Sequence, residues 1–292
     1  MTVELPDVSE FQTGSSAPNW AGIKKQNGGA GICRVGYGAA HLDHMFVSNY
    51  TELKKNKYAF IGLYHYIIAS VDAATQAAQF CKWVGPATAI APGTVFILDL
   101  EEGTGNQLSR ANAWLNHVDT FYGLNAKPLN MRSWLYSGQN FAVTTGLSPI
   151  FHSARHTWVA AYQASESGLL PHTMWQSTNG SLGTNIITWS GCGRCDTSIY
   201  HGDLPQLAAM GWPGHTAPPA DPKFHGEYTT AGMFSLAQVS EKLGYPTNTV
   251  LRMTAVHYGM FPGALGPWVH DVMTGAKPPT TPLPAGTKLW CD

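Results

Sequence analysis

The chain of 292 residues carries only 17 basic and 18 acidic side chains, a charged fraction of 12% where an ordinary soluble domain has about 25%. With 44% apolar and 11% aromatic residues it has enough apolar surface for a sizeable core, so a disordered chain is not expected. The net charge of −1 argues against nucleic acid as the main partner. The surplus of tryptophan and tyrosine suits a neutral, stackable ligand such as carbohydrate.

Short β-branched or aromatic runs alternate with segments of helical periodicity over the first two thirds of the chain. Strands are predicted at residues 31–36, 58–67, 94–100, 134–136 and 157–162. Helices are predicted at residues 72–84 and from an N-cap at Ser109 to Gly123. Beyond residue 145 the helical signal fades, while strand-like pieces continue around Met174, Ile187 and Ile199. The pattern predicts an α/β fold, an irregular TIM-like parallel β/α barrel whose last strands have lost most of their helices.

A proline-rich segment interrupts this pattern at residues 213–222 and predicts a semi-rigid linker. We therefore expect a barrel domain at residues 1–212 and a small α+β module at residues 223–292. In that module, short helices are predicted at residues 236–244 and from residue 247, followed by a strand at 287–291.

The sequence predicts neither a membrane span nor a secretory signal. It has no apolar run of about 18 residues, and its start lacks a basic and then apolar leader. Its five cysteines are an odd number, scattered over a chain too long to need a disulfide scaffold. Synthesis in the cytosol is expected.

Three of the 18 acidic residues fall within residues 99–102, directly after an apolar strand. On that strand Asp99 and Glu101 share one face, ~6.6–6.8 Å apart along the backbone. Catalytic residues of such barrels lie at the carboxyl ends of the strands, and repulsion between like charges raises one pKa toward neutrality, as a general acid requires. A solvated acidic loop or a divalent-cation site is the alternative.

Two isolated acids extend this cluster. Asp7 closes the first predicted strand and Asp196 opens the last one. If the barrel closes, these strands are neighbours, and the two carboxyls lie side by side at the rim that carries Asp99 and Glu101. Each could otherwise be a helix cap or a turn residue.

Seven motifs in order resemble glycoside hydrolase family 25, the muramidases of bacteria and of phage endolysins. They are Asp7-Val-Ser9 with Gln12, Gly62-Leu-Tyr-His-Tyr66, Leu98-Asp-Leu-Glu-Glu102, Leu135-Tyr-Ser137, Trp158-Val-Ala-Ala-Tyr162, Met174-Trp-Gln-Ser177 and Asp196. That family folds as an irregular β/α barrel whose last strands lack full helices. The resemblance covers residues 1–212.

The resemblance implies hydrolysis of the β-1,4 bond between N-acetylmuramic acid and N-acetylglucosamine in peptidoglycan, with no cofactor and no metal. Glu101 matches the general acid. Asp99 matches the second carboxylate, which either stabilises the oxocarbenium-like transition state or orients the acetamido group of the substrate as nucleophile. Supporting acids and aromatic residues for a sugar platform are also implied: Asp7 and Asp196, and Tyr64, Tyr136, Tyr162 and Trp175. Strand parity places His65 on the outward face, in a structural role.

In the C-terminal region, residues 229–244 and 283–289 resemble the start and end of a LysM domain, a βααβ unit that binds N-acetylglucosamine polymers. A stretch of about 25 residues that such a domain normally lacks separates the second helix from the last strand. A structural cap or another wall-binding module is the alternative.

Four other assignments find less support in the sequence. Cys192-Gly-Arg-Cys195 could be half a zinc site, but a local thiol pair or a disulfide explains it as well. The 12 histidines suggest a zinc amidase, but no HExxH motif occurs. In a Cys/His peptidase the nucleophile would be Cys33, which lies inside a predicted apolar strand. A non-enzymatic wall-binding or tail protein would not need both Asp99 and Glu101. We therefore expect a monomeric, endolysin-like muramidase, made in the host cytoplasm, released by a protein such as a holin, and acting on the bacterial cell wall.

Overall fold

The computed structural model describes residues 2–13, 17–213, 226–229 and 288–291. The chain divides into two compact units, Met1–His215 and Thr216–Asp292. The division falls inside the segment expected to be a linker, while the role of that segment stays a prediction.

Eight strands of the first unit close into a barrel, because β1 pairs with β11 on one side and with β2 on the other. The ninth strand, β3 (His41–Leu42), extends the sheet beside β2 only. The barrel strands are β1 (Val3–Val8), β2 (Ala30–Tyr37), β4 (Phe60–Tyr66), β5 (Thr94–Asp99), β6 (Trp134–Gly138), β7 (Thr157–Ala160), β8 (Met174–Asn179) and β11 (Asp196–Tyr200).

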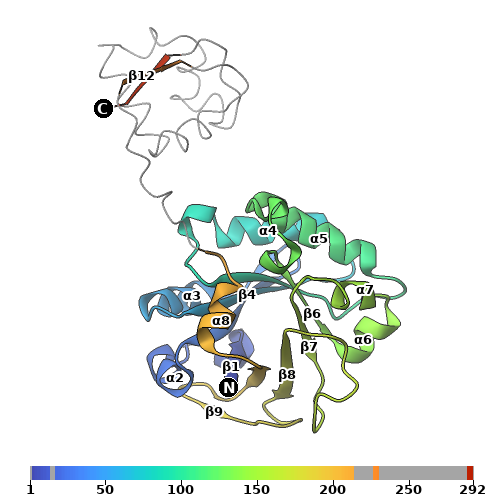
Figure 1. Ribbon diagram of the computed structural model, residues 1–292. Coiled ribbons are helices and arrows are strands. Elements are labelled where there is room, and N and C mark those ends of the chain that lie inside the picture. The colour runs from blue at the N-terminus through green and yellow to red at the C-terminus, as the bar shows by residue number, and fades with distance from the viewer. Residues whose placement is uncertain (1, 14–16, 214–225, 230–287, 292) are drawn as a thin grey trace. The chain divides into compact units, whose positions relative to one another are not determined.

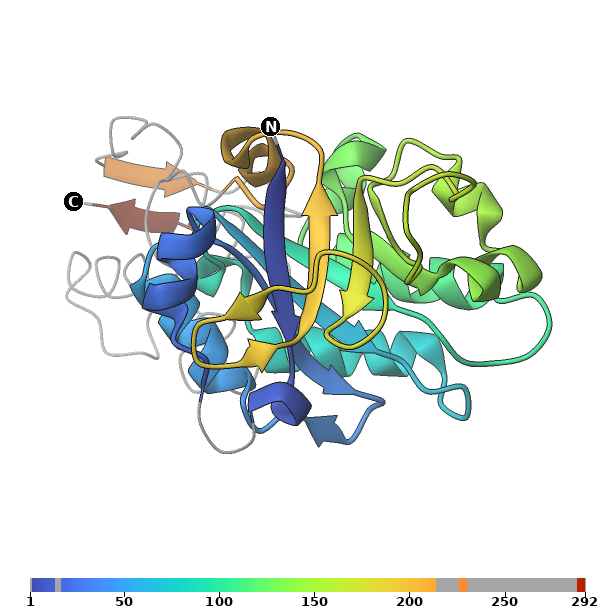
Figure 2. The same ribbon diagram turned by 90° about the horizontal axis from the view of Figure 1, so that it is seen from below.

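The direction of β11 departs from the sequence-based prediction. The barrel strands β1, β2 and β4 to β8 run parallel to one another, but β11 runs antiparallel to both β8 and β1. Figure 2 shows β1 and β11 side by side with their arrows opposed. The expectation of a fully parallel barrel was therefore wrong for the closing strand, because a hairpin, β9 (Thr188–Trp189) and β10 (Gly193–Arg194), replaces the helix that a parallel crossover would need.

Helices cover the outside of the first strands and thin out later, as predicted (Figure 1). Between β7 and β8, where every residue is described, no helix occurs. The helices are α1 (Glu10–Thr13), α2 (Trp20–Asn27), α3 (Phe46–Lys55), α4 (Ala73–Val84), α5 (Leu108–Phe121), α6 (Gln139–Thr144), α7 (Ser148–Phe151) and α8 (Leu204–Ala209), with short 3-10 turns η1 (Ala87–Ala89), η2 (Leu124–Ala126) and η3 (Leu129–Met131).

The two best-predicted helices differ in how they begin. Asp72 caps α4 by accepting a hydrogen bond from the Thr75 backbone N–H, as expected from its position. Helix α5 begins one residue before the predicted cap Ser109, at Leu108, and its N-cap Gln107 makes no side-chain capping bond. The backbone N–H of Gln107 instead donates to the Thr145 carbonyl, so the surrounding loop sets this boundary.

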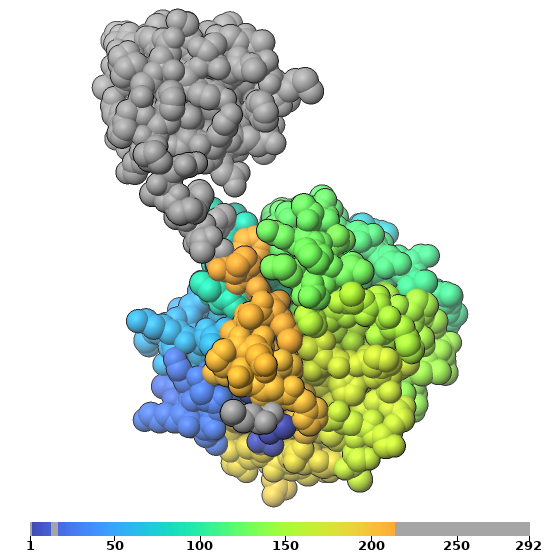
Figure 3. Space-filling view, viewed as in Figure 1, coloured from blue at the N-terminus to red at the C-terminus, as the bar shows by residue number. Residues whose placement is uncertain are grey.

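Apolar side chains fill two separate layers, one between the barrel and its helices and one inside the barrel. The inner layer includes Leu5, Phe60 and Trp134, and Leu207 of α8 packs against it. Helix α8 thus closes the end of the barrel where the parallel strands begin, and Figure 3 shows it lying across that end. With this end sealed by apolar groups, the polar residues of the interior gather at the other end.

Of the second unit, two strands are described. β12 (Gly226–Thr229) pairs antiparallel with β13 (Lys288–Cys291), and the latter covers most of the strand predicted at 287–291. The helices predicted at 236–244 and from 247 lie outside the described residues. Within the described part of the chain, no helix is both long and apolar enough to cross a membrane.

Candidate active site

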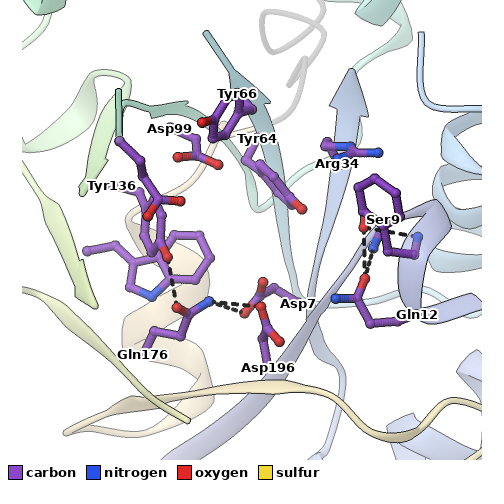
Figure 4. A pocket seen from close by; sticks show the side chains of 13 residues that line it. Asp7, Ser9, Gln12, Arg34, Tyr64, Tyr66, Asp99, Tyr136, Gln176 and Asp196 are labelled. Carbon is purple, nitrogen blue, oxygen red and sulfur yellow. Dashed lines mark hydrogen bonds between the residues drawn. The ribbon is translucent and has the colours of Figure 1, made fainter. Parts of the chain in front are cut away.

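A pocket of about 190 Å³ opens at the end of the barrel where the parallel strands finish. Its wall contains all four acidic residues singled out from the sequence. Figure 4 shows three of them, Asp7, Asp99 and Asp196, which come from strands far apart in the chain, and Glu101 lies two residues beyond the end of β5. These four acids, Asp7, Asp99, Glu101 and Asp196, are called the carboxyl cluster below.

Asp99 and Glu101 face the pocket together, as strand alternation predicts. β5 ends at Asp99, but the chain stays attached to β6 for one further residue, because the Leu100 N–H donates to the Tyr136 carbonyl. Ser137 Oγ in turn donates to the Leu100 carbonyl at 2.7 Å. Leu100 is therefore buried on the outer side, and the alternation continues to Glu101. Asp99 is only 4% exposed, whereas Glu101 lies exposed at the mouth.

Asp7 and Asp196 are directly paired in the register of β1 and β11. Asp7 lies near the end of β1 and Asp196 at the beginning of β11, so they meet only because the two strands run in opposite directions. In a parallel closing strand, its first residue would lie at the opposite end of the barrel. The predicted neighbourhood is confirmed, and the antiparallel direction is its cause.

All four carboxyls of this half-enclosed pocket have a raised pKa. Burial is the main cause for Asp7, whose pKa is raised well above its usual range, and the neighbouring Asp196 raises it further. Burial likewise raises the pKa of Asp196 to about 6. Loss of water around a carboxylate disfavours the charged form, and a like charge nearby adds to that effect.

The pKa values of Asp99 and Glu101 are linked by a hydrogen bond between the two side chains. Burial and the proximity of Glu101 raise the pKa of Asp99 well above its usual range. The protein around the Glu101 carboxyl also displaces water and raises its pKa, while the hydrogen bond from Asp99 counteracts the rise. Oδ1 of Asp99 is buried without a hydrogen-bond partner. The two carboxyls can therefore hold one proton between them at a higher pH than two isolated carboxyls would.

Gln176 connects the carboxyl cluster to two tyrosines. Its Nε2 donates to Asp7 Oδ2 at 3.0 Å and to Asp196 Oδ2 at 3.5 Å. Its Oε1 accepts from the hydroxyl groups of Tyr136, at 2.8 Å, and Tyr162, at 2.9 Å. Figure 4 shows the amide lying between Tyr136 and the two aspartates. Because both tyrosines donate to one end, the other end must present its N–H groups to the carboxyls.

The four aromatic residues predicted to bind sugar occupy different places. Tyr64 and Tyr136 line the pocket. Tyr162 is 40% exposed and reaches the site through its hydroxyl on Gln176. Trp175 is 4% exposed and packs in the outer apolar layer, with Nε1 donating to the Ala161 carbonyl. Its expected place in the sugar platform is therefore wrong: Trp175 and the inward-facing Gln176 lie on opposite faces of β8.

His65 has the structural position expected from parity. It is fully buried among aromatic rings, and Trp114 Nε1 donates to its Nδ1 at 3.2 Å. Burial lowers the pKa of His65 to about 4, so the ring is neutral at physiological pH.

Several pocket residues were not singled out from the sequence. Gln176 could have been found, because it follows Met174 by two residues and Met174 is an inner-layer residue. Trp158 lies against Tyr136, with ring centroids 4.2 Å apart, and donates to Ser198 Oγ at 2.9 Å. Arg34 is held by Asp43 and Glu10 at 2.8 and 2.9 Å, and its charge counteracts the rise in the pKa of Asp99. These long-range contacts leave no pattern in the local sequence.

No metal-binding arrangement occurs among the described residues, in which no group of three or more His, Cys, Asp or Glu side chains is placed to hold an ion. Cys192 and Cys195 are free thiols whose sulfur atoms lie 3.6 Å apart.

A closed β/α barrel with a carboxyl pair at its rim defines a class of acid-catalysing hydrolases, and comparison with known families agrees. The sequence profile described as glycosyl hydrolases family 25 matches residues 6–183. The chain belongs to this family and is a glycoside hydrolase. No curated protein matches the chain at a significant level.

Solved structures of the same fold are similar over about 70% of the chain. A muramidase from Trichobolus zukalii has 24% identity and a TM-score of 0.56, covering 71% of this chain and 98% of its own. A lysozyme from Streptomyces coelicolor has 21% identity and a TM-score of 0.55, covering 71% and 96%. The CTP1L endolysin has 20% identity and a TM-score of 0.53, covering 71% and 69%. At these identities the likeness establishes the shared barrel.

The raised pKa of Asp196 predicts that this side chain reduces stability at neutral pH. The pKa of this carboxyl is raised from 3.8 to about 6 in the folded protein. The charged side chain therefore destabilises the fold at a pH above about 6, and this destabilisation disappears as the pH falls to the ordinary pKa of 3.8. We expect Asp196→Asn to raise Tm at pH 7.5 by several degrees. The corresponding gain in the free energy of unfolding is at most about 3 kcal/mol. Thermal unfolding at pH 7.5 and pH 4 checks this. A gain in Tm that is the same at both pH values would contradict it.

Proposed function

We propose that this protein is an N-acetylmuramidase that hydrolyses the β-1,4 bond between N-acetylmuramic acid and N-acetylglucosamine in peptidoglycan. The observation that carries the proposal is the hydrogen-bonded pair of Asp99 and Glu101 at the mouth of the pocket. Membership of glycosyl hydrolases family 25 supports it. The fold shared with a muramidase and with a lysozyme supports it as well.

Glu101 is the general acid in this proposal. It is the exposed member of the pair, so a glycosidic oxygen can reach it, and its raised pKa lets it keep a proton at a higher pH than an ordinary glutamate. Proton transfer to the leaving oxygen assists cleavage of the bond as positive charge develops on the sugar ring.

Asp99 is the second carboxylate, placed deeper in the pocket. Because the pair shares one proton, its transfer through Glu101 to the leaving oxygen leaves both carboxyls without a proton. Asp99 then becomes an anion beneath the reacting sugar, where it stabilises the oxocarbenium-like transition state or orients the acetamido group of the substrate. The backbone separation of ~6.6–6.8 Å lies between the carboxyl distances of retaining and inverting glycosidases, ~5–5.5 and ~6.5–9.5 Å, so it leaves the stereochemical outcome open.

Asp7 and Asp196 act on the charge of the site. As anions they favour the protonated form of Glu101, since the pKa of Glu101 rises with the charge of Asp196. Gln176 is a positioning residue, because it holds both carboxyls while making no other contact that would compete for its N–H groups. Tyr64 and Tyr136 line the pocket and supply a sugar platform, with Tyr162 at its edge.

For the biological role we propose an endolysin of phage origin, released to the wall by a protein such as a holin, with a LysM-like wall-binding module after residue 222. The similar fold of the CTP1L endolysin supports the first part. The antiparallel pairing of β12 with β13 is consistent with the two strands of a βααβ unit. We take the enzyme to act as a monomer without cofactor.

Glu101→Gln should reduce hydrolysis of purified peptidoglycan by about 10²–10⁴-fold, because the amide cannot supply a proton. The adjacent Glu102→Gln is the matched control. One oxygen of Glu102 accepts from the Ala69 N–H and the other from the Tyr66 hydroxyl. In the variant the amide oxygen can accept from Ala69 while the amide NH2 donates to the Tyr66 hydroxyl oxygen, so the variant should keep most of the activity. Mass spectrometry of the products should find new muramic-acid reducing ends. Full activity of Glu101→Gln, or products ending in glucosamine or free peptide, would refute the assignment.

Gln176→Met should move the acidic limb of the kcat/KM profile to higher pH. Without the amide N–H groups the pKa of Asp7 rises further, because the hydrogen bond from Gln176 favours its charged form. The control is Gln76→Met, which removes an equally buried amide bonded only to backbone groups of residues 68 and 71. Loss of stability alone would lower activity in both variants. If the acidic limb of the kcat/KM profile stays at the same pH in Gln176→Met, the proposed positioning role of Gln176 is wrong.

A chain truncated after His215 should cleave soluble glycan fragments as well as the full chain does, but should act more weakly on intact walls. The apolar layers of the barrel are complete within the first unit, and Trp212 closes them by pairing its backbone with Gly93 and Thr94. Sedimentation with purified walls and turbidity assays measure the difference. Equal wall binding by both forms would contradict the proposed module.

A further inference from the structure

Cys192 and Cys195 form a thiol pair beside the carboxyl cluster that the proposed chemistry does not use. Their sulfur atoms are 3.6 Å apart, within hydrogen-bonding distance for two thiols. Both are free thiols, and Cys195 directly precedes Asp196 in the chain. Of the other cysteines, Cys33 and Cys81 are 0% and 1% exposed, so solvent does not reach them in the folded protein.

The turn that carries Cys192 is fixed against helix α2. The Cys192 N–H donates to the Trp189 carbonyl at 3.3 Å, and the turn between them needs Gly191 at a φ of +80°. A Cβ on Gly191 would lie 2.4 Å from the Asn19 backbone nitrogen, so turn and helix are in close contact. Asn19 N–H donates to the Ser190 carbonyl, and Ser190 N–H donates to the side chain of Gln26. The position of Cys192 is therefore set by packing.

Cys195 is held from the barrel side. It is 1% exposed, and its carbonyl accepts from Thr197 Oγ1 at 3.2 Å, while Trp189 Nε1 donates to that same hydroxyl at 2.9 Å. Between the two cysteines Gly193 has a φ of +68°, a conformation that brings the chain back toward itself and that glycine adopts without strain. The two sulfur atoms thus face each other because both ends of the segment are anchored.

The two thiols differ in reactivity. Cys192 is partly exposed, and the hydrogen bond from Cys195 lowers its pKa. The same hydrogen bond, together with burial, raises the pKa of Cys195. A pair of this kind has an accessible attacking thiolate and a protected second thiol that acts only after the first has reacted.

We propose that Cys192 and Cys195 form a reversible redox site, which a small-molecule disulfide oxidises to an intramolecular disulfide bond at the start of β11. The Cys192 thiolate attacks one sulfur of the oxidant, R–S–S–R, whose S–S bond breaks and releases one thiolate, which takes up a proton. Cys195 then loses its proton, its sulfur attacks the Cys192 sulfur, and the second R–SH leaves. Two protein thiols are oxidised, and one disulfide is reduced to two thiols.

The bond would tie the turn on α2 to the strand that carries Asp196. In the reduced protein that connection includes the hydrogen bond from Trp189 Nε1 to Thr197 Oγ1 and no covalent bond between the two cysteines. A covalent link would hold the start of β11 on entry into an oxidising medium, while the reduced form persists in a cytosol rich in thiols. The inference rests on the geometry of the thiols and holds whether or not peptidoglycan is the substrate.

The test uses the full chain in a Cys291→Ser background, so that the fifth cysteine cannot react. Reduced protein is exposed to oxidised glutathione, free thiols are then alkylated, and peptides are analysed by mass spectrometry. We expect the segment containing Cys192 and Cys195 to lose two hydrogen atoms and to retain no glutathione. Cys195→Ser should instead keep one glutathione on Cys192, and Cys192→Ser should stay unmodified, because Cys195 is buried.

A stable glutathione adduct on Cys192 with Cys195 still reduced would overturn the proposal, as would the failure of both thiols to react or capture at Cys195 in Cys192→Ser. Thermal unfolding gives an independent check. The oxidised protein should melt several degrees above the reduced form, and this difference should vanish in Cys192→Ser/Cys195→Ser. An oxidised form that melts at the same or a lower temperature would mean that the native positions do not fit the bond.

Discussion

The antiparallel insertion of β11 between β8 and β1 is the constraint on which the rest of the structure depends. It closes the barrel, and it brings the first residue of a strand to the end where seven other strands finish. Asp196 reaches Asp7 for this reason alone. A parallel closing strand would complete a more regular barrel but would leave the carboxyl cluster with three members.

Concentrating four acids in one pocket has an energetic cost that the surrounding contacts offset in part. The pKa of every member is raised because each carboxyl loses water, and for Asp7, Asp99 and Glu101 the like charges nearby add to this rise. Gln176 donates to two of them, and Arg34 places a positive charge near a third. The stability of the fold comes from elsewhere, namely the two apolar layers and the closure of the opposite end by α8. Function and stability are thus separated along the axis of the barrel.

The sequence was most informative where the structure depends on residues that are close together in the chain. Alternation along β5 placed Asp99 and Glu101 on one face, and the same rule put His65 outside the barrel. The Asp72 cap and the fading of helices after residue 145 were also readable locally. The start of α5 was missed, because a loop contact between Gln107 and Thr145 overrides the capping preference of Ser109.

What could not be predicted depends on contacts between distant segments. The direction of β11 follows from the β9–β10 hairpin, whose two-residue strands carry no periodic signal. Trp175 was predicted to bind sugar because it is aromatic, but its neighbour Gln176 faces the site instead. Only the placement of Met174 inside the barrel shows which of the two side chains points into the pocket. Ion pairs with Glu10 and Asp43 hold Arg34 at the pocket, and no local sequence motif predicts these pairs.

The central claim is that the rim of the barrel holds four carboxyls whose pKa values are all raised, chiefly because the surrounding protein excludes water from them. A carbon-13 NMR titration of the carboxyl carbons, with the four positions assigned from single Asn or Gln variants, tests it most directly. The account predicts that all four titrate above their ordinary ranges, with Asp196 near 6, while the exposed helix cap Asp72 titrates below its ordinary value. Four ordinary carboxyl titrations at the rim would contradict it.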